Sequence, residues 1–404
     1  MYYKKVTEDI VFDTFRKKYI NSCEVNPESP LNKLDIELIN EVKERRNRKY
    51  LNLIVTITSE CDLRCAYCFE NHLQRKAMSM ETCIDLLNEI KGYIETNDIE
   101  TIDCVLFGGE PMLNQDVLLF FVHEFSVYCG NMNIELDMMM TTNGIICDEE
   151  FFIELSKNGV TSIQLSFDGT ENTNNRRRCA KIENCNPYRE IMHNIIIMIN
   201  VFDVISVKYN FDQENCNEYR DFLRELGDAV GEKRNKITII LETINKTPFA
   251  EYGKEYDTTG RELAIQFIEM IKETINSNFY FVTRVFISPC MHTANNSYLI
   301  DTTGEAYSCI SSYGIEEFKI GKFNRDIQDV SIFKRNKYTK LDRIKEHCKN
   351  CCYIPLCWGG CAYVLKSGGK DIYKDVQCRR VYFDTIIEAF YNEITTKYGV
   401  KRIE

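Results

Sequence analysis

Three closely spaced cysteines are the residues of this sequence best suited to chemistry. They are Cys61, Cys65 and Cys68, separated by three and then by two residues. They directly follow the apolar run 51–58, so they are expected on a loop at the end of a strand. Three thiolates on one loop can bind one face of a four-iron cluster, which leaves the fourth iron open to another ligand. Structural cysteines or part of a zinc site would have the same spacing.

A second and denser series of cysteines begins at residue 290. Its seven members have the spacing of metal ligands: Cys290, Cys309, Cys348, Cys351, Cys357, Cys361 and Cys378. They could form two sites, one with four ligands and one with three. Zinc competes with iron–sulfur for cysteine pairs of the C-x2-C type. The other nine of the nineteen cysteines follow no ligand spacing, and most are expected to be ordinary buried thiols.

Length and composition exclude several classes of protein. The chain has 404 residues, 44% hydrophobic and 27% charged, which suits a large barrel with an appended module. The net charge of −11 argues against a nucleic-acid partner. The start of the chain lacks a signal sequence, and no apolar run reaches the ~18 residues of a membrane span. We therefore expect a cytoplasmic protein whose cysteines bind metal instead of forming disulfides.

Alternating strands and helices must position the first cysteine loop. Six short apolar runs, each followed by an amphipathic segment, lie between residues 51 and 276. The predicted strands cover residues 51–58, 101–107, 134–141, 161–167, 204–210 and 236–242. The predicted helices cover residues 80–95, 115–128, 148–157, 188–201, 214–226 and 259–275, with others at 34–48 and 381–396. Six such units predict a partial barrel or an open sheet, with the chemistry at the carboxyl ends of the strands.

Polar residues and glycines follow the predicted strands at the same end as the cysteines. The second strand leads into Gly-Gly-Glu-Pro at 108–111, and the third into Thr-Thr-Asn-Gly at 141–144. The fourth leads into Asp-Gly-Thr at 168–170, followed by three arginines at 176–178. A single short loop of this kind is weak evidence, but four at one end of a sheet predict a ring-shaped pocket.

Several of these motifs together resemble a radical SAM enzyme. The resemblance lies in the cysteine motif, with Tyr67 before its third cysteine, and in the Gly-Gly-Glu-Pro segment. The later cysteines match the seven-cysteine pattern of a SPASM domain, so the resemblance covers about residues 50–380. It implies an α/β fold of four parts: a short or vestigial leader-binding segment (1–50), a partial (β/α)6 TIM-like barrel (51–279), a SPASM domain (280–380) and a C-terminal helix (381–404).

The resemblance implies three [4Fe–4S] clusters and S-adenosylmethionine as cofactors. The first three cysteines would ligate the cluster that cleaves S-adenosylmethionine, and the resulting 5′-deoxyadenosyl radical would abstract hydrogen from the substrate. The resemblance also implies contacts to S-adenosylmethionine. Glu110, with exposed backbone N–H groups of Gly108 and Gly109, would bind its amino group, and Arg178 would bind its carboxylate. The ribose would be contacted by Thr142, Asn143 and Ser166, and the adenine by Tyr67. Turn or core roles remain open for the last four residues.

The SPASM pattern divides the later cysteines between two auxiliary clusters. It assigns Cys348, Cys351, Cys357 and Cys378 to an outer cluster, and Cys290, Cys309 and Cys361 to an inner one. The inner cluster has three ligands, so a substrate cysteine could bind its open iron, or Cys179 or Cys185 could complete it. Sulfatase-maturating relatives have a further cysteine in the region that corresponds to 281–288, and an aspartate where this chain has Ile310. This sequence has neither residue.

These features favour a maturase that forms a thioether, from a cysteine sulfur to a carbon atom, in a ribosomally made precursor peptide, as sactipeptide and ranthipeptide enzymes do. A second hypothesis is carbon–carbon or carbon–oxygen crosslinking or side-chain oxidation, including formylglycine formation. A third is a zinc-stabilised scaffold that binds peptides without catalysis. The expected partners are a cysteine-containing peptide and an electron donor such as flavodoxin or ferredoxin, with no nucleic acid and no membrane. A winged-helix leader-binding domain needs roughly 80 residues, so the segment before the barrel holds at most a shortened one.

Overall fold

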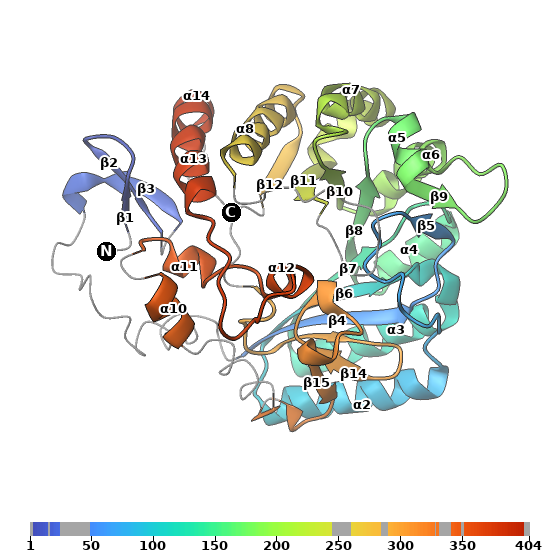
Figure 1. Ribbon diagram of the computed structural model, residues 1–404. Coiled ribbons are helices and arrows are strands. Elements are labelled where there is room, and N and C mark those ends of the chain that lie inside the picture. The colour runs from blue at the N-terminus through green and yellow to red at the C-terminus, as the bar shows by residue number, and fades with distance from the viewer. Residues whose placement is uncertain are drawn as a thin grey trace.

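A ten-stranded sheet curls around the centre of the molecule in the computed structural model (Figure 1). The structure describes residues 3–14, 17–24, 49–244, 260–283, 290–327, 329–330, 341–348 and 351–399. Along the sheet the strand order is β12-β11-β10-β8-β7-β6-β4-β13-β14-β15. None of the helices within these ranges has the length and apolar character needed to cross a membrane.

Eight neighbouring strands of this sheet are parallel. Six of them are the predicted strands, confirmed to within one residue at each end: β4 (Tyr50–Thr58), β6 (Thr101–Gly108), β7 (Glu135–Thr141), β8 (Val160–Phe167), β10 (Val204–Phe211) and β11 (Ile237–Thr243). The other two, β12 (Tyr280–Thr283) and β13 (Ser297–Ile300), lie beside β11 and β4. Residues assigned from the sequence to the SPASM domain therefore continue the sheet of the barrel at both of its edges.

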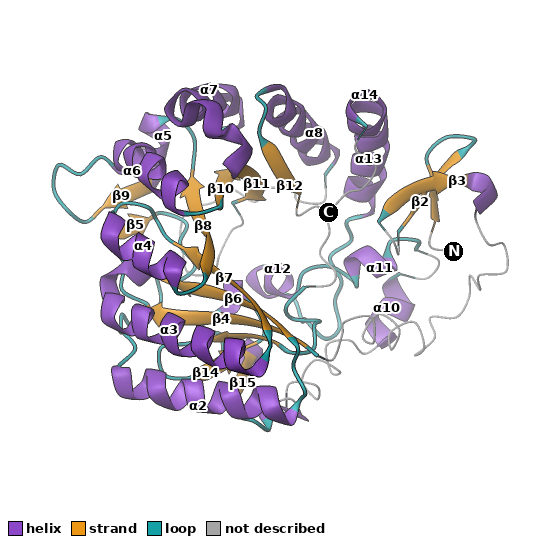
Figure 2. Cartoon of the chain, turned by 180° about the vertical axis from the view of Figure 1, so that it is seen from behind, coloured by secondary structure: helices purple, strands orange, loops and turns teal. Residues whose placement is uncertain are grey.

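Helices cover the outer face of the parallel strands, as Figures 1 and 2 show. They are α2 (Met80–Thr96), α3 (Gln115–Met132), α4 (Glu149–Lys157), α6 (Pro187–Val201), α7 (Tyr219–Val230) and α8 (Arg261–Asn276). Alternate strand residues such as Leu53, Val55 and Leu106 are fully buried against them in one continuous core. The fold is thus the predicted partial barrel.

The helix predicted from residue 214 begins later, as α7 at Tyr219. The loop before it is held by side chains, because Asp212 Oδ1 accepts from the Glu214 N–H at 2.8 Å and Asn215 Oδ1 accepts from the Asp212 N–H at 2.8 Å. The short 3₁₀ helix η3 (Cys216–Glu218) then leads into α7. Local side-chain to backbone bonds of this kind compete with helix formation, which accounts for the difference.

Two strands of three residues each were not predicted. The strand β5 (Leu63–Cys65) lies inside the first cysteine loop, and β9 (Arg178–Ala180) follows the helix α5 (Glu171–Arg177). They pair antiparallel, with Cys65 opposite Arg178. Pairing over so few residues leaves no periodic pattern in the sequence.

The cysteine-rich region after β13 contains the hairpin strands β14 (Glu305–Tyr307) and β15 (Lys319–Lys322) and short helices. These are α10 (Leu341–His347), α11 (Ile354–Cys357) and α12 (Ala362–Ser367). The predicted C-terminal helix is α13 (Arg380–Phe390), which continues through a π-helical turn at Tyr391–Thr395 into α14 (Thr396–Tyr398). The helix α13 packs against α8 beside the barrel (Figure 1).

A small antiparallel sheet near the N-terminus was also not predicted. It consists of β1 (Tyr3–Lys5), β2 (Ile10–Asp13) and β3 (Lys18–Asn21). It docks on α13, where the Tyr19 hydroxyl donates to the Ile387 carbonyl at 2.5 Å and Lys4 pairs with Asp384 at 2.9 Å. The helix predicted at 34–48 lies outside the described residues.

Candidate functional site

The first cysteine loop leaves the carboxyl end of β4 and is held in place by backbone pairing. The β5–β9 pair sets Cys65 opposite Arg178, and the Ala66 N–H donates to the Arg177 carbonyl at 2.8 Å. At the other side of the pair, the Lys181 N–H donates to the Asp62 carbonyl at 2.8 Å. The loop is therefore fixed to the segment that follows the fourth strand of the barrel.

The three cysteines of this loop lie within electrostatic reach of one another. Burial raises the pKa of Cys65 to about 12, and the neighbouring Cys68 and Cys61 add to that rise. Burial also raises the pKa of Cys68 to about 11. The Arg178 guanidinium opposes the rise at Cys65. Thiols gathered in this way are costly to ionise unless a cation joins them, which is what a metal cluster supplies.

Glu110 is a buried carboxylate beside this loop. It accepts from the Asn143 N–H at 2.7 Å, from the Thr142 hydroxyl at 2.9 Å and from the Met112 N–H at 3.1 Å. Burial raises the pKa of Glu110 to about 7. A carboxylate offers about four acceptor positions, so three donors leave it one for a further N–H group.

The two glycines before Glu110 lie against the backbone at the end of β4 and just after it. A Cβ atom on Gly108 would lie 2.0 Å from the Thr58 carbonyl oxygen, and one on Gly109 would lie 2.2 Å from the Glu60 carbonyl oxygen. The Gly109 N–H donates to the Thr58 carbonyl at 2.8 Å. The prediction that the glycines present exposed N–H groups is therefore wrong for Gly109, because that group pairs with the end of β4. The glycines allow the second strand-end loop to lie directly on the first.

Thr142 and Asn143, predicted at a ribose, form contacts within the protein. Besides their bonds to Glu110, the Asn143 side-chain amide donates to Asp62 and lies 3.9 Å from Cys61 Sγ. This turn therefore links the carboxylate to the cysteine loop. Ser166 lies further along the sheet on β8, half-buried and beside Lys208 of β10. A ribose contact for these three residues stays a prediction.

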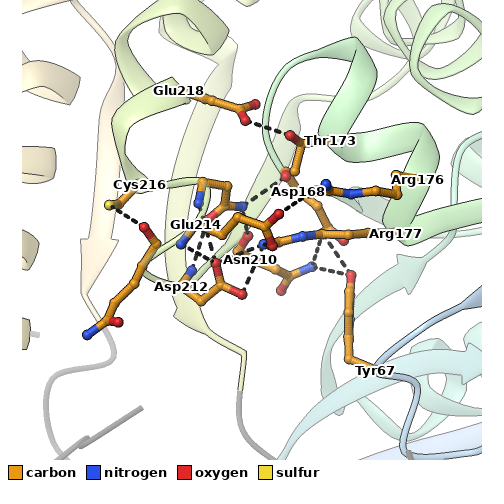
Figure 3. A network of polar contacts seen from close by, with 12 residues as sticks. Tyr67, Asp168, Thr173, Arg176, Arg177, Asn210, Asp212, Glu214, Cys216 and Glu218 are labelled. Carbon is orange, nitrogen blue, oxygen red and sulfur yellow. Dashed lines mark hydrogen bonds and ion pairs between the residues drawn. The ribbon is translucent and has the colours of Figure 1, made fainter. Parts of the chain in front are cut away.

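The three consecutive arginines have three different environments. Arg177 is fully buried, with Nη2 at 2.8 Å from Asp212 Oδ1 and 2.9 Å from Glu214 Oε2 (Figure 3). Arg176 is exposed and pairs with Glu214. Only Arg178 turns toward the cysteine loop, where Cys65 and Asp168 are among the groups that raise its pKa. The structure thus brings the predicted arginine, and not its neighbours, to the cysteines.

Tyr67 takes part in a buried polar network that the sequence did not reveal. Its hydroxyl donates to Asp168 Oδ1 at 2.7 Å and accepts from Asn210 Nδ2 at 3.2 Å (Figure 3). Arg178 Nη1 lies 3.5 Å from the same hydroxyl. The tyrosine therefore ties the cysteine loop to the ends of β8 and β10. The only signal for it was the position of Asp168 and Asn210 at strand ends.

The later cysteines influence one another electrostatically in two sets. Burial raises the pKa of Cys309 to about 12, with Cys361 and Cys290 adding to the rise. Burial also raises the pKa of Cys348 to about 12, and there Cys357, Cys351 and Cys378 add to it. In the described part of the chain, no three Cys, His, Asp or Glu side chains lie close enough to hold a single metal ion. We call the first group the inner thiols and the second the outer thiols.

Cys179 and Cys185 lie away from the inner thiols. Cys179 is on β9, and its thiol contacts the Arg176 carbonyl at 3.2 Å. Burial raises the pKa of Cys185, and the nearby Glu190 and Asp62 add to the rise, so this thiol belongs beside the first cysteine loop. In Figure 1, β9 lies beside β5 at the right of the view, whereas α12, which begins after Cys361, lies near the centre of the view. Neither cysteine completes the inner group in this structure.

The donor sets fit the cofactors that the sequence suggested. Nine of the ten thiols in the three groups are half-buried or buried, and Cys378 of the outer group is exposed; cysteine thiolates are the usual ligands of iron–sulfur clusters. Next to the first group, Glu110 has an acceptor position to spare, and Arg178 is a buried guanidinium whose Nε has no hydrogen-bond partner among the described residues. A carboxylate and a guanidinium on two sides of one loop suit a zwitterionic amino acid group.

The fold and this loop together define a class of protein. Residues 55–226 match the Radical SAM superfamily, and this part of the chain is a radical SAM domain. The matched segment contains the first three cysteines and the Gly-Gly-Glu-Pro sequence, which the zinc-scaffold hypothesis does not explain. The family implies a [4Fe–4S] cluster and S-adenosylmethionine.

Individual relatives share more of the chain than this domain. The chain is 23% identical to a cysteine-type anaerobic sulfatase-maturating enzyme of Clostridium perfringens, over 76% of this chain and 88% of that enzyme. It is 26% identical to the enzyme of the same name from Clostridium novyi, over 76% and 87% of the two chains.

Solved structures with a similar fold extend into the cysteine-rich region. The structure of native anSMEcpe with bound AdoMet superposes with a TM-score of 0.65 at 20% identity, covering 87% of this chain and 100% of that one. Streptococcus suis SuiB bound to the precursor peptide SuiA superposes with a TM-score of 0.61 at 17% identity, covering 85% and 79%. These likenesses support the fold of the partial barrel with its cysteine-rich extension.

Proposed function

We propose that this protein is a radical SAM maturase that joins a cysteine sulfur to a carbon atom within a ribosomally made precursor peptide. The observation that carries the proposal is the gathering of Cys290, Cys309 and Cys361 into a group of three thiols, one short of the four ligands that fill a [4Fe–4S] cluster. Solved structures of similar fold that hold a Cp18Cys peptide or the precursor peptide SuiA support a peptide substrate.

The first cysteine loop would hold the cofactors of radical formation. Cys61, Cys65 and Cys68 would ligate the [4Fe–4S] cluster that, with S-adenosylmethionine, supplies the radical that abstracts hydrogen. Glu110 would accept a hydrogen bond from the amino group at its remaining acceptor position, and Arg178 would bind the carboxylate. The network around Tyr67 keeps the loop in place, so these groups are oriented before the cofactor binds.

The inner thiols would set the type of reaction. With three ligands from the protein, the fourth position of an inner cluster is available to the thiolate of a substrate cysteine. The positions of Cys179 and Cys185 support this assignment, because both adjoin the first cysteine loop and its neighbours. The outer thiols would bind a second auxiliary cluster with four ligands, so the whole chain would hold about twelve iron atoms.

Formylglycine formation is the second candidate, favoured by the names of the relatives that share 76% of the chain. That reaction needs a base near the substrate cysteine. The residue after Cys309 is Ile310, which packs against an apolar cluster with Tyr307 and Tyr313. An isoleucine cannot accept a proton, so this position supports the thioether reaction over the oxidation.

The test is turnover of a cysteine-containing precursor peptide by the anaerobically reconstituted enzyme, followed by mass spectrometry and alkylation. We expect the product to lose two hydrogens and its cysteine to resist alkylation. The matched control is the same peptide with alanine in place of cysteine, which should be left unmodified. Free thiols after turnover, or modification of the alanine peptide, would contradict thioether formation and favour crosslinking elsewhere. Conversion of the cysteine to an aldehyde would identify formylglycine formation.

A further inference from the structure

The inner and outer thiols share one wall, formed by two short segments of the chain. The first is the turn Trp358-Gly359-Gly360, which connects Cys357 of the outer group to Cys361 of the inner group, and its three φ angles are all positive, at 49°, 80° and 98°. The second is the segment 377–379, which follows α12. The Gln377 N–H donates to the Gly359 carbonyl at 2.7 Å. A Cβ atom on Gly360 would lie 2.4 Å from the Gln377 Cβ, so the two segments are in direct contact.

Gln377 contacts a cysteine of each group. Its side-chain oxygen accepts from the Cys361 N–H at 3.3 Å, and its backbone carbonyl oxygen lies 4.0 Å from Cys357 Sγ. The next residue, Cys378, belongs to the outer thiols. The segment 377–379 therefore runs between the inner and outer thiols. The residue after Cys378 has its backbone at the place where the two groups adjoin.

That residue is Arg379, and aromatic rings hold its guanidinium in place. Its Cζ lies 4.3 Å from the centre of the Tyr382 ring and 5.4 Å from that of Phe383, both buried on α13. Arg379 directly follows Cys378 of the outer thiols. It also lies two residues after Gln377, which contacts Cys357 and Cys361, so its backbone lies beside both groups. The adjacent Arg380 acts on the outer group, where it opposes the rise in the pKa of Cys351.

We propose that Arg379 is a positive charge shared by the two auxiliary sites, and that it raises the reduction potential of the clusters held at both. The inference rests on the proposed function, which assigns the inner and outer thiols to clusters. Reduction adds one electron to a cluster, and a nearby cation stabilises the more negative state. Arg379 would therefore act on the clusters through its charge and not by contact with the substrate. The contacts of Gln377 hold the backbone that carries this charge in place.

The test compares reduction potentials in the holoenzyme, measured by anaerobic potentiometric titration followed by electron paramagnetic resonance. In Arg379→Gln we expect both auxiliary midpoint potentials to shift to more negative values, while the potential of the cluster on the first cysteine loop stays unchanged. Arg379→Lys keeps the charge and should return both auxiliary potentials toward those of the wild type. Arg380→Gln is the matched control, and it should shift one auxiliary potential only.

Each other outcome overturns the inference. It fails if Arg379→Gln moves neither potential or only one, or if the lysine variant shifts as far as the glutamine variant. If the glutamine variant does not retain iron, Arg379→Met keeps the aliphatic stem over the rings and removes the charge. Iron analysis separates this test from that of the proposed function: about twelve irons per chain with unmoved potentials refutes only the shared charge, whereas about four irons in the wild type refutes the auxiliary clusters themselves.

Discussion

Arg176, Arg177 and Arg178 are neighbours in the sequence, yet each guanidinium meets a different set of groups. The helix α5 ends at Arg177 and the strand β9 begins at Arg178, so the side-chain direction changes between them. Arg177 consequently points to the acidic loop after β10, while Arg178 points to Cys65. The end of the helix between the second and third arginines therefore gives neighbouring guanidinium groups different surroundings.

Removing the buried arginine should destabilise the protein more than removing its exposed neighbour. In Arg177→Gln, Asp212 loses its partner at a site where the arginine side chain is 0% exposed, and we expect a loss of about 2 to 3 kcal/mol in the free energy of unfolding. Arg176 is 58% exposed, so Arg176→Gln should cost less than about 1 kcal/mol. Urea unfolding of both variants measures the difference, and equal losses would contradict the assigned roles.

Glu110 should make stability depend on pH. Burial raises its pKa from 4.5 to about 7, so between these values the folded state binds more protons than the unfolded state. Stability from this group is therefore present below about pH 4.5 and lost as the pH rises to about 7, by up to about 3 kcal/mol. Glu110→Gln should have a smaller fall in unfolding free energy between pH 5 and pH 7.5 than the wild type. Parallel pH profiles for the two proteins would show that another group carries the effect.

At the scale of elements, the sequence predicted the repeated strand–helix units of the barrel, but it did not predict the strands of three or four residues. The six strands of the barrel and their helices were found because burial on two faces gives long apolar runs and a helical period. The β5–β9 pair and the N-terminal sheet have three or four residues per strand and no such pattern. In the site, cysteine spacing indicated two sets of metal ligands, and only the resemblance to a SPASM domain assigned each thiol to one of them. The network around Tyr67 depends on tertiary contacts between residues 101 and 143 positions apart, which local sequence does not encode.

Removing iron should loosen the short helices before it affects the barrel. The helices α11 and α12 have four and six residues, too few for stability without tertiary support, and both adjoin cysteines of the auxiliary groups. We expect amides in these two helices to exchange hydrogen faster in chelator-treated protein than in iron-loaded protein, while those of β6, β7 and β8 stay protected. Hydrogen–deuterium exchange with mass spectrometry measures this. Equal change in the barrel strands would show that the clusters stabilise the whole chain.

At the scale of the whole molecule, the two ends of the described chain pack together. The N-terminal sheet and α13 meet through Lys4, which pairs with Asp384 at 2.9 Å and with Glu388 at 3.0 Å, and through Tyr19. The carbonyl of Cys352, next to Cys351 of the outer group, accepts from the Thr14 hydroxyl at 2.8 Å. The sheet therefore also contacts the segment that carries the outer thiols.

Tyr19→Phe should weaken this docking without unfolding the sheet. The variant loses the hydrogen bond to the Ile387 carbonyl but keeps the ring contacts with Phe12 and Tyr391, each at 5.0 Å between ring centres. We expect a cost of about 1 kcal/mol, visible as faster amide exchange in the N-terminal strands and unchanged exchange in β4. Tyr398→Phe is a matched control, because that hydroxyl bonds to exposed Asn276. The same effect in both variants would contradict a specific role for Tyr19.

The pairing of β13 with β4 has a consequence for synthesis on the ribosome. Ser297–Ile300 of β13 align with Asn52–Val55 of β4. One edge of β4 therefore stays unpaired until a strand more than two hundred residues later has been synthesised. Until then the nascent chain presents an open parallel edge to chaperones and to other chains. The last outer thiol, Cys378, emerges later still, so the four outer thiols can come together only after residue 378 has been made.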